Sequence, residues 1–316
     1  MGITEATIFE QFPYWQAAIA PTQPLAGAEI TVFLGCGSSY NLALSLAVLA
    51  NAKGRPAIAV PAGEWLDHAQ NYWPNWRAAQ IVALSRSGET TETVAAAKLS
   101  RSAGAFVTAI TAESGSALTT ACDRLVFAQT HPAEGIVMTA SASLMLLLGT
   151  QLLGYSMAPT VPGAAQHLLD DVDARLPALI GDRSHFVFLG GGALHGIALE
   201  AALKVMEMSQ VFTQAFHPLE YRHGPISLVD ERTLAVMLYG AAQPEIESRL
   251  VSELQDKGAK VIGFGGPGDL SFAVPAGPTA GLIALPALQL LGERVAQSHN
   301  IDTVAPRHLT KVVTLA

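Results

Sequence analysis

Three small hydroxyl side chains lie close together in the sequence, at Ser85, Ser87 and Thr90, around a single glycine, Gly88. The apolar run Ile81–Leu84 predicts a buried strand before them, and the residues after them predict a helix. A turn between a strand and a helix leaves backbone N–H groups at the helix start, where the helix dipole favours an anion. Gly88 also allows the backbone to approach a bound anion closely. The stretch therefore predicts a phosphate site that needs no metal.

A second group of chemically capable residues lies in the apolar stretch Ile197–Val211, whose charged residues are Glu200, Lys204 and Glu207. Their spacing places all three on one stripe of a helix. The stripe either faces solvent with a Glu–Lys pair or is the polar face of a buried helix beside a site. Spacing alone favours the solvent-facing interpretation because surface pairs are common, although the apolar face is wide.

Further candidates are His217, His223 and Lys311. His223 precedes a Gly-Pro pair, and a histidine on such a loop is a candidate acid or base, although a lone histidine is more often structural. Lys311 lies among apolar residues near the end of the sequence. Most such lysines are solvated, but a desolvated lysine loses its proton more easily and can form a Schiff base.

The pair Gly35 and Gly37 after an apolar run invites comparison with dinucleotide-binding sites. The third glycine of that fingerprint is missing, since Tyr40 stands at its position and His195 at the equivalent place in the second half. Neither turn has a Walker-type lysine, and no metal-ligand spacing occurs. We therefore expect neither a cofactor nor a metal.

The elements that must position these residues are strands buried on both faces, because their apolar runs do not alternate. They are predicted at Ile30–Gly35, Ala57–Val60, Ile81–Leu84, Phe106–Ile110, Leu125–Ala128, Phe186–Gly190, Thr213–Phe216, Leu234–Leu238 and Lys260–Phe264. Such strands are typical of an α/β fold with a parallel sheet between helices. Ligands bind beyond the carboxyl ends of these strands, where the hydroxyl turn and the Gly35–Ser39 turn both lie.

An internal repeat predicts two domains. Val32–Gly37 recurs as Val187–Gly192, 155 residues later, a period far longer than that of a solenoid. Pro159–Gly163 is the predicted linker. The counterpart of the hydroxyl turn, Tyr239–Pro244, has no hydroxyl cluster, so one phosphate site per chain is expected.

Composition narrows the class of protein. The 316 residues carry a formal net charge of −8 without a Lys/Arg run, which argues against a nucleic-acid partner. Two cysteines suit a reducing compartment. Residues 1–24 do not form a signal peptide, and Leu144–Leu153 is too short to span a bilayer. We expect a soluble cytoplasmic protein without a membrane partner.

Five motifs in the same order resemble the sugar isomerase (SIS) domain family, and within it the isomerase half of glutamine–fructose-6-phosphate aminotransferases. They are the segments 35–40, 85–90, 198–204, 220–225 and 306–311. The resemblance covers nearly the whole chain. It implies two tandem SIS domains, each a flavodoxin-like three-layer sandwich with a parallel sheet flanked by helices.

The resemblance also implies site residues. Phosphate or sugar binding is implied for Cys36, Ser38, Ser39, Ser85, Arg86, Ser87, Thr90, Val137 and Thr139. Glu207 matches a carboxylate that moves a proton between C1 and C2, and Glu200 and Lys204 match supporting polar residues. His223 matches a ring-opening histidine supplied by the neighbouring subunit, and Lys311 a Schiff-base lysine.

These matches predict a helical lead-in (1–24), a first domain with the phosphate site (25–160), a second domain (161–299) and a tail with Lys311 (300–316). The predicted partners are a phosphorylated amino sugar and a second copy in a homodimer with shared sites. The predicted reaction converts glucosamine 6-phosphate to fructose 6-phosphate and ammonia. The alternatives are a fructosamine-6-phosphate deglycase and a non-catalytic sugar-phosphate sensor.

The sequence differs from the synthases at several points, and these differences bear on the choice between an enzyme and a sensor. The resemblance does not extend to the glutaminase domain of the synthases, and no N-terminal cysteine nucleophile occurs, so we do not expect ammonia release from glutamine. Arg86 stands where synthases have a phosphate-contacting glutamine, and Ser141 replaces a lysine. SIS-domain regulators carry a helix-turn-helix segment, for which residues 1–24 are too short. The retained acid/base residues therefore favour an enzyme.

Overall fold

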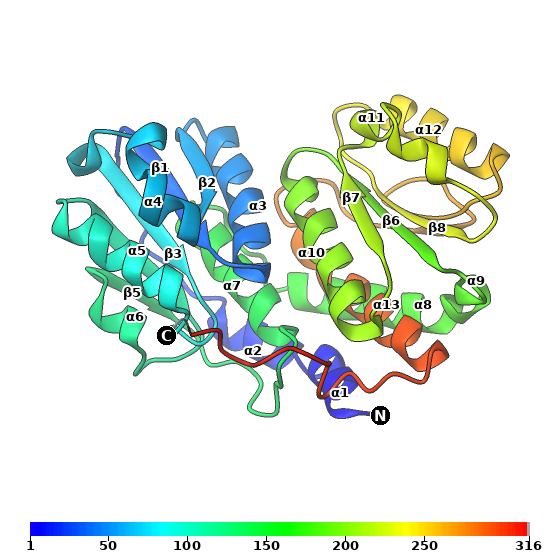
Figure 1. The fold of residues 1–316 in the computed structure, drawn as a ribbon, viewed down its shortest axis with the longest axis horizontal. Helices are drawn as coiled ribbons and strands as arrows, with labels where there is room; N and C mark the ends of the chain where they lie inside the picture. Colours follow the sequence, from blue (N-terminus) through cyan, green and yellow to red (C-terminus); the bar gives the residue numbers. More distant parts are fainter. Residues whose placement is uncertain (315–316) are drawn as a thin grey trace.

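The computed structural model describes residues 1–314 and shows two halves, each built on a five-stranded parallel sheet with flanking helices (Figure 1). The strand orders are β2-β1-β3-β4-β5 and β10-β9-β8-β6-β7. The strands are β1 (Ile30–Gly35), β2 (Ala57–Pro61), β3 (Ala79–Leu84), β4 (Phe106–Thr111), β5 (Arg124–Phe127), β6 (His185–Gly190), β7 (Thr213–Phe216), β8 (Thr233–Leu238), β9 (Lys260–Phe264) and β10 (Leu270–Phe272). The predicted α/β fold is confirmed.

Helices flank both sheets, and two of them precede the first strand. They are α1 (Ile3–Phe9), α2 (Phe12–Ala18), α3 (Ser38–Ala52), α4 (Ala62–Tyr72), α5 (Thr91–Ser102), α6 (Ala117–Thr120), α7 (Ala140–Leu152), α8 (Val161–Arg175), α9 (Pro177–Ile180), α10 (Ala193–Ser209), α11 (Pro218–Tyr221), α12 (Pro244–Asp256) and α13 (Ala280–Ser298), with 3₁₀ turns η1 (Trp76–Ala78) and η2 (Pro225–Leu228). Within residues 1–314, no helix has both the length and the apolar character needed to cross a membrane.

The nine predicted strands are present, with ends that differ from the predicted ones by at most two residues. The repeat is structural, because β6 begins at His185, 155 residues after the start of β1 at Ile30. The short β10 was not predicted, since its three residues give no pattern. The linker prediction is wrong in part: Val161–Gly163 form the first turn of α8, where a proline is tolerated because its missing N–H is not needed.

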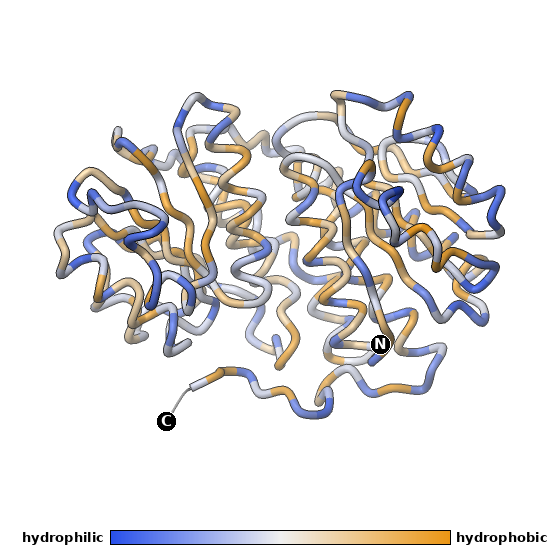
Figure 2. Tube along the Cα trace, turned by 45° about the horizontal axis from the view of Figure 1, so that its top comes forward, coloured by the Kyte–Doolittle hydropathy of each residue, from blue (hydrophilic) through white to orange (hydrophobic). Residues whose placement is uncertain are grey.

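The strands have apolar side chains on both faces, and the two faces of the first sheet belong to different cores. Val32 and Ile81 pack in a core under α4 and α5. Phe33 and Val82 point to a larger core that continues through both halves and includes Phe188 of β6. Figure 2 shows this apolar character along the strands of both halves. The two halves are therefore joined by a shared core.

Helices α3 and α10 hold the halves together at one close approach. A Cβ atom added to Gly196 of α10 would lie 2.4 Å from the Asn41 carbonyl oxygen of α3. Only glycine permits this contact without a backbone shift. The approach brings the polar residues of α10 against the first half.

The chain returns to the first half after α13. Residues 299–314 contain no helix or strand and run from the second half to the first (Figure 1). The Thr4 hydroxyl of α1 donates to the Thr303 carbonyl oxygen at 3.2 Å, near the start of this tail. The tail thereby carries Lys311 to the first sheet.

Candidate active site at the carboxyl edge of the first sheet

Two turns meet where β1 and β3 end side by side. Leu34 pairs with Ala83 in their parallel register, so the turn after Gly35 lies next to the turn after Leu84. The chain leaves β1 for α3, which packs in the shared core, and leaves β3 for α5, which packs on the other face of the sheet. Such a switch point is where open parallel sheets bind ligands.

In the hydroxyl turn, residues 85–90, side-chain hydroxyls accept hydrogen bonds from backbone N–H groups of the same turn. The Ser85 hydroxyl accepts the Gly88 N–H at 3.1 Å and lies 3.4 Å from the Thr90 hydroxyl. The Ser87 hydroxyl accepts the Glu89 N–H at 3.2 Å. Gly88 has φ +63°, and a Cβ there would lie 1.9 Å from the Ser116 hydroxyl oxygen. Gly88 therefore allows the tight turn that gathers the hydroxyls at the start of α5, where an anion is favoured.

The neighbouring turn is built in the same way. Gly37 has φ +53°, and a Cβ on Gly35 would lie 2.6 Å from the Ser39 carbonyl carbon. Ser38 and Ser39 are buried at the start of α3. The Cys36 thiol faces α5, 3.6 Å from the Thr93 hydroxyl, and burial raises its pKa. These residues line the base of the turn rather than an open surface.

The charged stripe of α10 is buried, so the solvent-facing interpretation is wrong. Glu200 is 0% and Lys204 1% exposed, whereas Glu207 is 21% exposed. Lys204 Nζ donates to Glu207 Oε2 at 2.5 Å and lies 3.6 Å from Glu200 Oε1. Glu200 Oε2 accepts a hydrogen bond from Asn41 Nδ2 at 3.1 Å. One ammonium is thus shared by two carboxylates.

The pKa shifts follow from this burial. Burial raises the pKa of Glu200, and Lys204 opposes that shift. Burial alone would lower the pKa of Lys204, but the carboxylates of Glu200 and Glu207 outweigh it and raise that pKa. Lys204 therefore stays charged between the two carboxylates.

Arg86, within the hydroxyl turn, connects this turn to the tail and to the Glu134 loop. Its guanidinium donates to the carbonyl oxygens of Gly135, at 3.0 Å, and Lys311, at 2.8 Å. Burial lowers the pKa of Arg86, while the carboxylates of Glu134 and Glu207 oppose that shift. The charged stripe of α10 is joined to the first half by the hydrogen bond from Asn41 to Glu200.

Sequence reasoning missed Glu134, which organises one wall of the site. Its Oε1 accepts the N–H groups of Thr139, at 2.6 Å, and Ser141, at 3.0 Å, at the start of α7. An acidic residue shortly before a helix was the available signal. Its backbone carbonyl accepts Lys311 Nζ at 2.9 Å. The Glu134 loop thus holds both α7 and the tail lysine.

Two predicted sugar contacts lie inside this wall. Val137 is 4% and Thr139 0% exposed. The Thr139 hydroxyl bonds Glu134 Oε1 at 3.1 Å and the Thr7 hydroxyl at 2.7 Å. This conformation therefore does not present either side chain to a ligand, and their contact with sugar hydroxyls stays a prediction.

His223 is not brought to this site within one chain. It is exposed in the turn after α11, and α11 lies at the end of the second half opposite the tail (Figure 1). His217 instead accepts the Leu219 N–H through Nδ1 at 3.2 Å and caps α11. Its role as a ring-opening residue supplied by a neighbouring subunit stays a prediction.

A cavity of about 390 Å³ lies beside the tail, and its lining includes Arg86, Ser87, Glu113, Glu134 and Lys311. The cavity is therefore lined by ionisable groups and a predicted phosphate-binding hydroxyl. Within residues 1–314, no three His, Cys, Asp or Glu side chains cluster in a way that could hold a metal ion.

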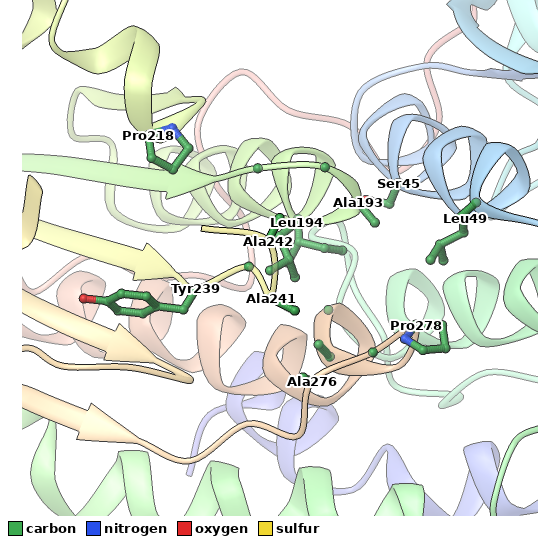
Figure 3. A pocket seen from close by; sticks show the side chains of 18 of the residues that line it. Ser45, Leu49, Ala193, Leu194, Pro218, Tyr239, Ala241, Ala242, Ala276 and Pro278 are labelled. Carbon is green, nitrogen blue, oxygen red and sulfur yellow. The ribbon is translucent and has the colours of Figure 1, made fainter. Parts of the chain in front are cut away.

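The second half has a larger counterpart, a cavity of about 620 Å³ at the edge between β6 and β8 (Figure 3). Its glycine turn keeps the same backbone, since Gly192 has φ 58° and ψ −132° and Gly37 has φ 53° and ψ −125°. Ala193 and Leu194 stand there in place of Ser38 and Ser39, and the Tyr239 hydroxyl donates away from the cavity, to the Pro267 carbonyl oxygen. The expectation of one phosphate site per chain stays a prediction.

The sequence of this chain is similar to those of known proteins. A profile of the SIS domain matches residues 25–154 and 179–268. A glutamine–fructose-6-phosphate aminotransferase from Halobacterium salinarum is 29% identical over 93% of this chain and 53% of its own length. One from Methanothermobacter thermautotrophicus is 28% identical over 95% of this chain and 54% of its own length. This chain therefore spans about half the length of these relatives.

Solved structures share the whole fold. A glucosamine-6-phosphate deaminase from Thermotoga maritima superposes with a TM-score of 0.87 at 30% identity, covering 99% of this chain and 100% of that one. A tagatose-6-phosphate ketose/aldose isomerase from Escherichia coli has a TM-score of 0.81 at 22% identity, covering 96% and 94%. The latter shows likeness of fold alone.

Proposed function

Because this chain belongs to the SIS domain family, we propose that it is an enzyme that converts glucosamine 6-phosphate and water to fructose 6-phosphate and ammonia. The observation that carries this proposal is the buried Lys204 between Glu200 and Glu207, with Glu200 bonded to Asn41 in the first turn of α3. Buried charges are costly unless they are paired, and their place at a ligand-binding edge favours a catalytic role.

The reaction needs proton transfer and imine exchange. The hydroxyl turn holds the phosphate, and His223 of the partner subunit opens the sugar ring. Glu207 accepts the proton from C2 as O1 gains one, and then returns it to C1, so that the C2 amine becomes an imine. The Lys311 amine attacks C2 and releases ammonia, and water hydrolyses the new imine to the ketone and free lysine. Atoms balance with one water consumed.

Two features support the deaminase over other reactions of this class. The Thermotoga maritima protein of that name is 30% identical over nearly the whole of both chains. Lys311, the residue proposed to form the imine, lies at the Glu134 loop of the first half. An isomerase acting on unsubstituted sugars would need the proton transfer but not this amine.

The test is a panel of phosphorylated sugars, including glucosamine 6-phosphate and fructosamine 6-phosphate, assayed for ammonia and for ketose phosphate. We expect equal amounts of ammonia and fructose 6-phosphate from glucosamine 6-phosphate. The variant Glu207→Gln should lose turnover, and Glu231→Gln, on the exposed surface, should keep it. Binding of sugar phosphates without turnover of any panel member would overturn the enzyme in favour of a sensor.

A further inference from the structure

The carbonyl oxygen of Lys311 is fastened to the phosphate turn by a buried arginine. Arg86 is only 8% exposed, and its guanidinium donates to that oxygen at 2.8 Å and to the Gly135 carbonyl oxygen at 3.0 Å. Hydrogen bonds from a charged donor are stronger than those between neutral groups. One side chain therefore joins the tail, the Glu134 loop and the hydroxyl turn.

Arg86 is itself held rigidly. Its own carbonyl oxygen accepts the Ala112 N–H and the Thr111 hydroxyl, both at 3.1 Å, so its backbone continues the pairing of β3 with β4. On the other side, the Glu134 carboxylate fixes the loop to the start of α7. The Arg86 guanidinium therefore contacts the tail from a backbone that is itself held in place.

The last part of the tail, residues 305–314, has few hydrogen bonds to the rest of the chain. For residues 305–314, the described hydrogen bonds to the rest of the chain are the two at Lys311, one through its carbonyl oxygen and one from Nζ to Glu134. Imine formation requires Nζ to leave the Glu134 carbonyl, and the bond from Arg86 is then the one that remains.

We infer that Arg86 is a positioning residue that fixes the backbone of Lys311 while its amine moves, a role whose catalytic part rests on the proposed function. The planar guanidinium serves two carbonyl oxygens at once, whereas a lysine ammonium at the end of a flexible stem does not reproduce this fork. Arg86→Lys keeps the positive charge beside the phosphate turn and removes the fork. The two roles of Arg86, tail anchor and phosphate ligand, are therefore separable.

The first measurement does not depend on activity. Arg86→Lys and Arg86→Met are digested with trypsin, and cleavage after Arg307 is followed by mass spectrometry, with the surface variant Arg101→Lys as control. Since cleavage follows the population of the released tail, we expect both Arg86 variants to be cut about 10- to 100-fold faster than the wild type. Lys311→Met retains its carbonyl oxygen and should be cut less rapidly than either Arg86 variant. If an Arg86 variant does not fold, Lys311→Met takes its place in the comparison with the wild type.

The second measurement tests catalysis. Borohydride trapping of the imine at saturating glucosamine 6-phosphate should slow by a similar factor in both Arg86 variants, while Arg101→Lys traps the imine at the wild-type rate. Wild-type rates of cleavage in both variants overturn the inference. If the wild type traps no imine, the proposed function fails, and the trypsin result still decides whether Arg86 anchors the tail.

Discussion

Replacing Lys204 by methionine tests whether the stripe of α10 is a buried charge network. Lys204 Nζ lies 2.5 Å from one carboxylate of the stripe and 3.6 Å from the other, and the side chain is 1% exposed. Removing one partner of a buried pair typically costs about 3–5 kcal/mol, because the charge left behind has no counter-ion. We expect Lys204→Met to lower the free energy of unfolding at neutral pH by about that amount.

The sign of the pH dependence follows from the pKa of Glu200, which burial already raises. Without Lys204 that pKa rises further, so the variant is most stable when the carboxylate is protonated and loses stability as the pH rises through the raised pKa. The deficit against the wild type should therefore shrink toward about pH 5 and grow toward about pH 8.

Urea unfolding followed by circular dichroism measures both effects. Adding Glu200→Gln and Glu207→Gln to Lys204→Met should recover most of the loss, because neutral amides leave no unpaired charge. A deficit below about 1 kcal/mol that does not change with pH would refute the reasoning and indicate solvated charges.

Four further predictions concern the site and its frame. Glu207→Gln should reduce turnover by about 10²–10⁴-fold with little change in sugar-phosphate affinity; solvent deuterium entering C1 or C2 at the wild-type rate would exclude Glu207 as the proton carrier. Ser87→Ala or Thr90→Val should each weaken sugar-phosphate binding by about 1.5–3 kcal/mol in calorimetry, and unchanged affinity in both would contradict the phosphate turn. Mixing inactive Glu207→Gln and His223→Ala subunits should restore some activity, whereas no recovery after verified exchange would argue against shared sites. Gly196→Ala should destabilise the protein by about 1–3 kcal/mol in urea unfolding, since its Cβ would lie 2.4 Å from α3 backbone; a wild-type midpoint would mean that the helices can separate.

The sequence predicted well what local patterns determine. Unbroken apolar runs located β1 and β3, and a cluster of hydroxyls around Gly88 located the turn between β3 and α5. These features depend on neighbouring residues, so one stretch of chain contains the information.

Features that depend on distant segments were not predictable in this way. Spacing placed Glu200 and Lys204 on one stripe but could not show that Asn41 of α3 covers it. The Arg86 contact with the carbonyl oxygen of Lys311 joins residues 225 positions apart, and backbone acceptors have no residue-type signal. The family resemblance named the site residues, but not Glu134 or the bonds that hold the tail.

The contact between α1 and the tail has a consequence for biosynthesis. Thr4 and Thr303, joined by a hydrogen bond, are 299 residues apart, so α1 completes its contacts only after the tail is made, although its Thr7 hydroxyl can already meet Thr139 of the first half. At ribosomal rates of about 5–20 residues per second, the interval between the two is about 15–60 s. The first sheet can pair as soon as β5 emerges, yet its lysine arrives only with the tail. A nascent chain can therefore carry a folded hydroxyl turn long before it carries Lys311.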